Sequence, residues 1–131
     1  TTSPVRVARC ACGQISATCR GEPLLVSLCH CFECQRRTGS TYGIAAFFPA
    51  GDVDLSGTAT RYARAGDSGH DVVHYFCPQC GSTVYWEPMK KPGIIAVAVG
   101  AFADPGFPAP SQSVYRDRRH DWVIDQLSAK P

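Results

Sequence analysis

Seven of the eight cysteines in this sequence fall into one triplet and two pairs. These cysteines are the triplet Cys29, Cys31 and Cys34, the pair Cys10 and Cys12, and the pair Cys77 and Cys80. Cysteines this close in sequence converge on one metal ion more readily than they form an unstrained disulfide bond with each other. Since thiolate ligands are typical of zinc, the spacing predicts two zinc ions per chain.

The pair Cys77 and Cys80 has the spacing of a zinc knuckle, and Gly81 follows it directly. A knuckle supplies two ligands, so two more are needed. Cys10 and Cys12 are the natural partners, because alternate residues of an extended segment point to the same face. Four thiolates complete a tetrahedral zinc and predict a structural site. Redox chemistry at this Cys-x-x-Cys would need a βαβ context, which the sequence does not show.

The triplet supplies only three thiolates, so the fourth position of its zinc is open to two interpretations. A protein ligand could complete the site; the candidates are His30, His70, His74, His120 and Cys19. Alternatively, water or a substrate thiolate binds there, which would make the three cysteines catalytic. Three thiolates lower the Lewis acidity of zinc, which disfavours hydrolysis and favours binding of a further thiol.

The residues that follow the triplet could bind the rest of a thiol substrate. Arg36 and Arg37 could hold carboxylates through paired hydrogen bonds, although a solvated pair on a short helix is the alternative. Thr38 and Gly39 could add hydroxyl and backbone donors around the same ligand. Glu33 is a possible proton carrier.

The length of 131 residues suits a single domain over residues 1–131. The net charge of +2 argues against a nucleic-acid partner, and no run of apolar residues is long enough to span a membrane. Residues 1–9 lack the apolar core of a secretory signal. We therefore expect a cytoplasmic protein with reduced cysteines.

Short alternating apolar stretches separated by turn signals predict an all-β domain with little helix. Two of them, 52–55 and 58–63, flank Ser56-Gly57 like the strands of a hairpin. The knuckle should lie at the tip of another hairpin, between strands at 70–76 and 82–86. A helical turn is expected over 31–38, with Gly39 as its stop. A helical tail is expected from about Arg118 to Leu127.

Three segments together resemble the glutathione-dependent formaldehyde-activating enzyme family, which also includes the centromere protein V type. The segments are Cys10-x-Cys12-Gly13, then Cys29-His30-Cys31-x-x-Cys34-Gln35-Arg36-Arg37-Thr38-Gly39, and Phe76-Cys77-x-x-Cys80-Gly81-Ser82. The resemblance implies a β-tent fold of small antiparallel sheets. It also implies a structural zinc on the two pairs and a second zinc on the triplet.

The resemblance further implies carbon–sulfur lyase chemistry, in which the glutathione thiol adds reversibly to formaldehyde to give S-hydroxymethylglutathione. The expected partners are therefore a small thiol such as glutathione and a small aldehyde. Two other hypotheses remain open at this point: a non-catalytic carrier of glutathione or another thiol, and a purely structural zinc protein.

Overall fold

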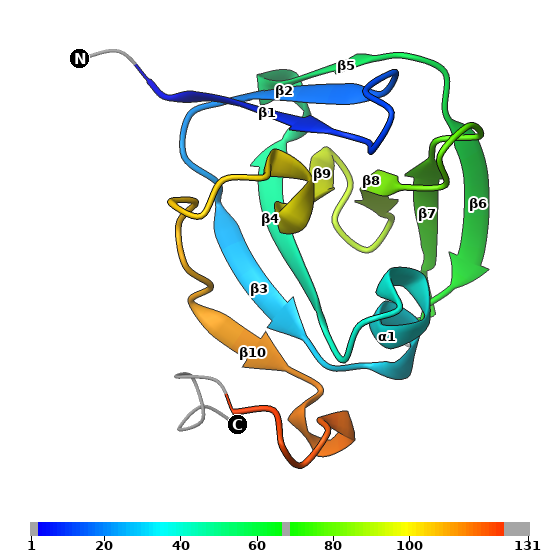
Figure 1. The fold of residues 1–131 in the computed structure, drawn as a ribbon, viewed down its shortest axis with the longest axis vertical. Helices are drawn as coiled ribbons and strands as arrows, with labels where there is room; N and C mark the ends of the chain where they lie inside the picture. Colours follow the sequence, from blue (N-terminus) through cyan, green and yellow to red (C-terminus); the bar gives the residue numbers. More distant parts are fainter. Residues whose placement is uncertain (1–2, 67–68, 125–131) are drawn as a thin grey trace.

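The structure, a computed structural model, describes residues 3–66 and 69–124 and contains two β-sheets. The smaller sheet has three antiparallel strands in the order β1-β2-β5. Their bounds are β1 Val5–Arg9, β2 Ser16–Arg20 and β5 Val53–Ser56. Figure 1 shows this sheet lying across one end of the molecule, above the strands of the larger sheet.

The larger sheet has seven strands in the order β10-β3-β4-β9-β8-β7-β6. Their bounds are β3 Leu25–Cys29, β4 Gly43–Pro49, β6 Thr60–Ala65, β7 Asp71–Phe76, β8 Thr83–Pro88, β9 Ile94–Ala98 and β10 Gln112–Val114. Neighbouring strands are antiparallel except β10, which runs parallel to β3. This parallel pair is possible because a long connection through residues 99–111 carries the chain back across the sheet.

The remaining regular structure is short. The helix α1 (Phe32–Thr38) connects β3 to β4, and three 3-10 turns occupy η1 Ala50–Asp52, η2 Val99–Phe102 and η3 Arg116–Arg118. The prediction of an all-β fold with little helix is therefore confirmed. The sheets differ from the expected small antiparallel ones in that one is wide and includes a parallel pair. None of the helices described is long and apolar enough to cross a membrane.

The main core lies between the two sheets. Ile15, directly before β2, and Ala17 on β2 are fully buried in one cluster with Phe48, Val84 and Val97 from the larger sheet. Buried and half-buried residues alternate along β2, whereas β8 and β9 are buried on both faces, because successive side chains point to opposite sides and Trp86 and Ala96 pack in a second cluster. The core therefore fixes the smaller sheet over β4, β8 and β9.

Two predicted elements are wrong. The strands on either side of Ser56-Gly57 do not form a hairpin: β5 pairs with β2 and β6 pairs with β7, so the turn passes the chain from one sheet to the other. The predicted helical tail is also not found over residues 119–124, where the chain forms turns and irregular structure. The rest of that tail lies outside the described residues.

Candidate metal centres and adjoining hollows

Cys10, Cys12, Cys77 and Cys80 come together although Cys12 and Cys77 are 65 residues apart in sequence. Their sulfur atoms all lie within 4.8 Å of one another, with 3.7 Å between Cys10 and Cys12 and 3.6 Å between Cys12 and Cys77. Zinc–sulfur bonds of about 2.3 Å in a tetrahedron place neighbouring sulfurs roughly 3.8 Å apart. The four donors therefore fit zinc.

Backbone and side-chain donors surround these sulfurs. The backbone N–H of Ile15 donates to Cys10 Sγ at 3.2 Å, and the side-chain amide of Gln14 donates to Cys77 Sγ at 3.1 Å. The hydroxyl of Ser82 lies 3.4 Å from Cys80 Sγ and lowers the pKa of that thiol to about 5. Such donors stabilise thiolates, the form in which cysteine binds a metal.

The second cluster lies where β3 passes into α1. Cys29 ends the strand, Cys31 is the N-cap of the helix, and Cys34 lies in the first turn. The Sγ of Cys31 accepts the backbone N–H of Cys34 at 3.3 Å, so the sulfur acts as the helix cap. The three sulfur atoms lie within 4.8 Å of one another, which fits three ligands of one zinc.

Hydrogen bonding within the triplet separates the acidities of its thiols. Hydrogen bonds from the thiols of Cys29 and Cys34, together with the backbone N–H of Cys34, lower the pKa of Cys31 to about 2. The same contact with Cys31 raises the pKa of Cys29. The triplet is therefore arranged to carry a negative charge at Cys31, which suits a cation bound between the sulfurs.

No fourth histidine, cysteine or acidic ligand joins the triplet within residues 3–66 and 69–124. His30 is fully buried and points away from the cluster: its Nε2 lies 3.0 Å from Ser113 Oγ, and its ring meets Tyr42 edge-on. Successive residues of an extended backbone point to opposite sides, which is why His30, between Cys29 and Cys31, faces away from both.

The other proposed fourth ligands lie elsewhere. His74 packs against Trp86 with the ring centroids 5.6 Å apart, and His120 Nε2 lies 3.0 Å from the side-chain oxygen of Gln35. Cys19 is buried in the main core. His70 lies nearer the triplet, since it lines the hollow beside it without joining the cluster.

A hollow of about 230 Å³ opens onto the triplet. The triplet cysteines form one wall, and Arg64, His70, Lys90 and Tyr115 contribute polar groups from β6, the β6–β7 connection, the segment after β8 and the segment after β10. Glu33 lies at the edge of this hollow, next to Cys34 in sequence. The open side of the triplet therefore faces a space that a small molecule can enter.

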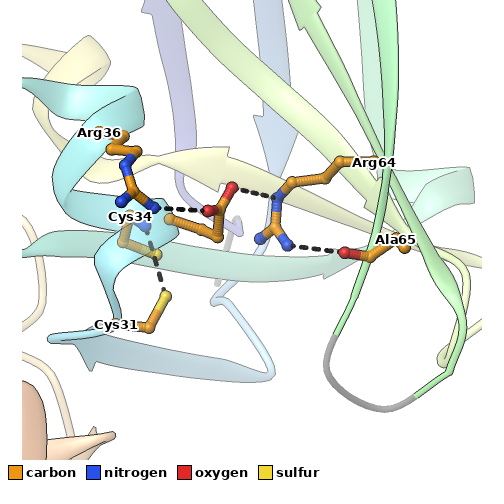
Figure 2. A network of polar contacts seen from close by, with 6 residues as sticks. Cys31, Cys34, Arg36, Arg64 and Ala65 are labelled. Carbon is orange, nitrogen blue, oxygen red and sulfur yellow. Dashed lines mark hydrogen bonds and ion pairs between the residues drawn. The ribbon is translucent and has the colours of Figure 1, made fainter.

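A second hollow of about 350 Å³ lies on the other side of Glu33. It shares Glu33 and Arg64 with the first hollow and adds Arg36, Arg37 and Tyr62. In Figure 2 Arg36 reaches from the helix and Arg64 from β6 toward the space between them. Glu33 joins the two, with 3.0 Å to Arg36 and 3.8 Å to Arg64.

Arg37 has a more sheltered position than Arg36. Its guanidinium lies 4.3 Å from the centre of the Trp86 ring, a cation–π contact. Gly43 is also close, since an added Cβ there would lie 2.7 Å from the Arg37 Nη2. Gly43 and Trp86 therefore hold the guanidinium between α1 and the sheet, at the wall of the second hollow.

Thr38 and Gly39 have a structural role at the end of α1. The Thr38 hydroxyl donates to the carbonyl of Cys34 at 2.8 Å, and Gly39 has the left-handed conformation of a helix C-cap, with φ 68°. Gly39 is thus the helix stop that the sequence predicts. The predicted contact of these two residues with a thiol stays a prediction.

Sequence reasoning did not identify Arg64, Lys90 or Tyr115 as neighbours of the triplet, and it named His70 only as one of five candidate fourth ligands. Each comes from a segment far from Cys29–Cys34 in sequence, and none belongs to a spacing pattern. Tyr115 carries one local signal, a left-handed backbone with φ 54°, but that is visible only in the structure. Pairing of distant strands decides which residues face the cysteines.

Comparison with known proteins places these features in a family. The family profile described as glutathione-dependent formaldehyde-activating enzyme matches residues 5–118. The chain belongs to this family. The resemblance drawn from the three cysteine segments is confirmed, and at family level the function is of the glutathione-dependent formaldehyde-activating type.

A solved structure supports the fold. A crystal structure of a Rhodobacter sphaeroides protein, a structural genomics target, is similar with a TM-score of 0.59 and 22% sequence identity. The alignment covers 82% of this chain and 98% of that one. At this identity the likeness concerns the fold alone. A search of curated proteins gives no significant match.

Proposed function

We propose that this member of the glutathione-dependent formaldehyde-activating enzyme family is a zinc-dependent carbon–sulfur lyase of the S-(hydroxymethyl)glutathione synthase type. It would join the thiol of glutathione, or a similar thiol, to a small aldehyde such as formaldehyde, or cleave the adduct. The observation that carries this proposal is the three-cysteine cluster, which lacks a fourth ligand among the described residues and opens onto a hollow.

The two cysteine clusters would have different roles, one structural and one catalytic. We assign a structural zinc to the two cysteine pairs and a second zinc to Cys29, Cys31 and Cys34, which we regard as the catalytic residues. When bound at the triplet, zinc supplies a soft cation that keeps a thiol in its reactive thiolate form at neutral pH.

The reaction needs little beyond this thiolate and correct placement. The sulfur forms a bond to the aldehyde carbon, the π electrons of the C=O bond move to the oxygen, and that oxygen takes up the proton that the thiol has lost. Holding both reactants in one hollow makes the addition effectively intramolecular. Lys90 and Tyr115 line the same hollow. Their polar groups would stabilise the negative charge that develops on the aldehyde oxygen during the addition.

We further propose that Arg36 and Arg37 hold carboxylates of the thiol substrate. Both line the second hollow, which shares Glu33 and Arg64 with the hollow at the triplet. Thr38 and Gly39 would support this arrangement by ending the helix directly after Arg37. The donors are cationic and fork-shaped, which suits carboxylate recognition.

Exchange NMR with ¹³C-formaldehyde and glutathione tests the proposal, because the uncatalysed addition is reversible and its rate is measurable in the same sample. The zinc-loaded protein should raise the exchange rate between free aldehyde and adduct. Cys31→Ser should return it to the uncatalysed rate while the far-UV circular dichroism stays unchanged. Glutathione binding without acceleration would instead support a carrier. Absence of both binding and acceleration would support a structural role.

A further inference from the structure

The described residues that line the second hollow carry more positive than negative charge. Among the residues lining it, Arg36, Arg37 and Arg64 are cationic and Glu33 is the one anion. His74, also in its wall, has a pKa lowered to about 4 by burial and by the nearby arginines. It therefore stays neutral at physiological pH and hardly adds to the charge.

The Glu33 carboxylate occupies a position between two arginines where a substrate carboxylate could bind instead. It bridges Arg36 on the helix and Arg64 on β6, and both Glu33 and Arg64 line the two hollows. The Glu33 side chain is 46% exposed and that of Arg36 is 75% exposed, so the contact is weak and easily exchanged. Arg64 is only 20% exposed, which makes its guanidinium the better anchor for an incoming anion.

We propose that Arg64 anchors a carboxylate of the thiol substrate in the second hollow and that Glu33 occupies this carboxylate's place in the free protein. This inference rests on the proposed function, and it narrows the substrate to thiols that carry a carboxylate several bonds from the sulfur, as peptide thiols do. The thiol lies at the triplet, and the chain extends past Glu33 to Arg64. A thiol without a carboxylate gains nothing from this subsite.

The strand that carries Arg64 also supplies a matched control. Arg61 lies on the same strand, but successive residues alternate, so it faces the opposite side and is absent from both hollows. Its neighbour there is Tyr75, its partner across β6 and β7. Arg61→Gln and Arg64→Gln therefore make the same change in net charge, but only the second alters the proposed subsite.

Isothermal titration calorimetry of the zinc-loaded protein, in a thiol-free reductant, can test this with three probes. The probes are glutathione, its ethyl ester at the glycine carboxylate, and 2-mercaptoethanol. Arg64→Gln should weaken glutathione binding roughly tenfold, as loss of a charge-assisted hydrogen bond does. Arg61→Gln should change it by less than twofold, and neither variant should change binding of 2-mercaptoethanol.

The ester distinguishes a direct contact from a general effect of charge. If Arg64 binds the glycine carboxylate, the ester should bind the wild-type protein about as weakly as glutathione binds Arg64→Gln, and the two changes together should add little further. Glu33→Gln should tighten glutathione binding roughly two- to fivefold, because a competing surface ion pair is removed. Weaker glutathione binding by Glu33→Gln would overturn the proposal that Glu33 occupies the place of the substrate carboxylate.

Failure of this inference differs from failure of the proposed function. Equal glutathione binding by the wild type and Arg64→Gln overturns the subsite while leaving the triplet as a thiol site. Fully additive effects of the ester and Arg64→Gln would overturn a contact between Arg64 and the glycine carboxylate. Absence of binding for both glutathione and 2-mercaptoethanol would instead overturn the proposed function.

Discussion

Cys77→Ser and Cys31→Ser should affect the stability of the fold very differently, although each removes one thiolate from a predicted zinc site. The four-cysteine site joins segments that are 65 residues apart, between Cys12 and Cys77, and it links the smaller sheet to the larger one. The triplet closes only the six residues from Cys29 to Cys34. The two ions therefore constrain very different lengths of the unfolded chain.

Loop-closure entropy gives the scale of this difference. A cross-link that closes 65 residues stabilises the fold by about 4 kcal/mol, and one that closes six residues by about 2 kcal/mol. The larger figure is comparable to the whole stability of a small domain. Cys77 is also fully buried, so a serine there would place a hydroxyl among donors already directed at a sulfur.

The triplet substitution should be tolerated for an additional reason. Cys31 caps α1 by accepting the N–H of Cys34 through its sulfur. Serine is among the best N-cap residues, so Cys31→Ser should preserve the start of the helix. The expected result is a protein that keeps its fold while it loses one zinc.

Zinc content, circular dichroism and urea unfolding together form the assay. The wild type should carry two zinc ions, and a chelator titration should release one without loss of β-structure and the second together with unfolding. Cys31→Ser should carry one zinc and unfold near the wild-type urea midpoint, whereas Cys77→Ser should be largely unfolded. Unfolding of Cys31→Ser together with a folded Cys77→Ser would refute the assignment of roles.

Three further predictions concern the surroundings of the triplet. Ser113→Ala removes the 3.0 Å hydrogen bond to buried His30 and should lower the free energy of unfolding by about 1–3 kcal/mol, measured in urea, with Ser113→Thr as the partial rescue. Gly43→Ala should displace the Arg37 guanidinium, because the new Cβ would lie 2.7 Å from its Nη2. We expect a changed NMR signal of that guanidinium and a free energy of unfolding within about 1 kcal/mol of wild type; an unchanged signal would contradict the reasoning. Burial lowers the pKa of His74 to about 4 from 6.5, so on acidification the unfolded chain takes up a proton at a higher pH than the folded protein does. The free energy of unfolding should therefore fall as the pH drops from 6.5 toward 4. His74→Gln should make this dependence of stability on pH less steep, and an unchanged dependence would contradict the reasoning.

The two cysteine clusters could be predicted from sequence, the triplet because its three members are close together along the chain. The helical turn that follows Cys31 could be predicted from local spacing, as could its stop at Gly39. The pairing of Cys10 and Cys12 with the knuckle follows by elimination, since a knuckle needs two further ligands. Local chemistry and ligand counting were sufficient for these sites.

The pairing of strands could not be predicted in the same way. The turn at Ser56-Gly57 has the composition of a hairpin, but β5 pairs with β2 in the smaller sheet and β6 pairs with β7 in the larger one. A turn sequence specifies only that the chain bends, whereas the fit of side chains in the core decides which strands become neighbours.

The sequence by itself determined the two cysteine clusters, the all-β class and the family, because these depend on residue types and short spacings. Only the tertiary structure decided what faces the open side of the triplet. Arg64 and Tyr115 reach it because β6 lies at one edge of the large sheet and β10 pairs in parallel with β3 at the other. Such contacts between distant segments depend on how the whole core packs, which no short stretch of sequence encodes.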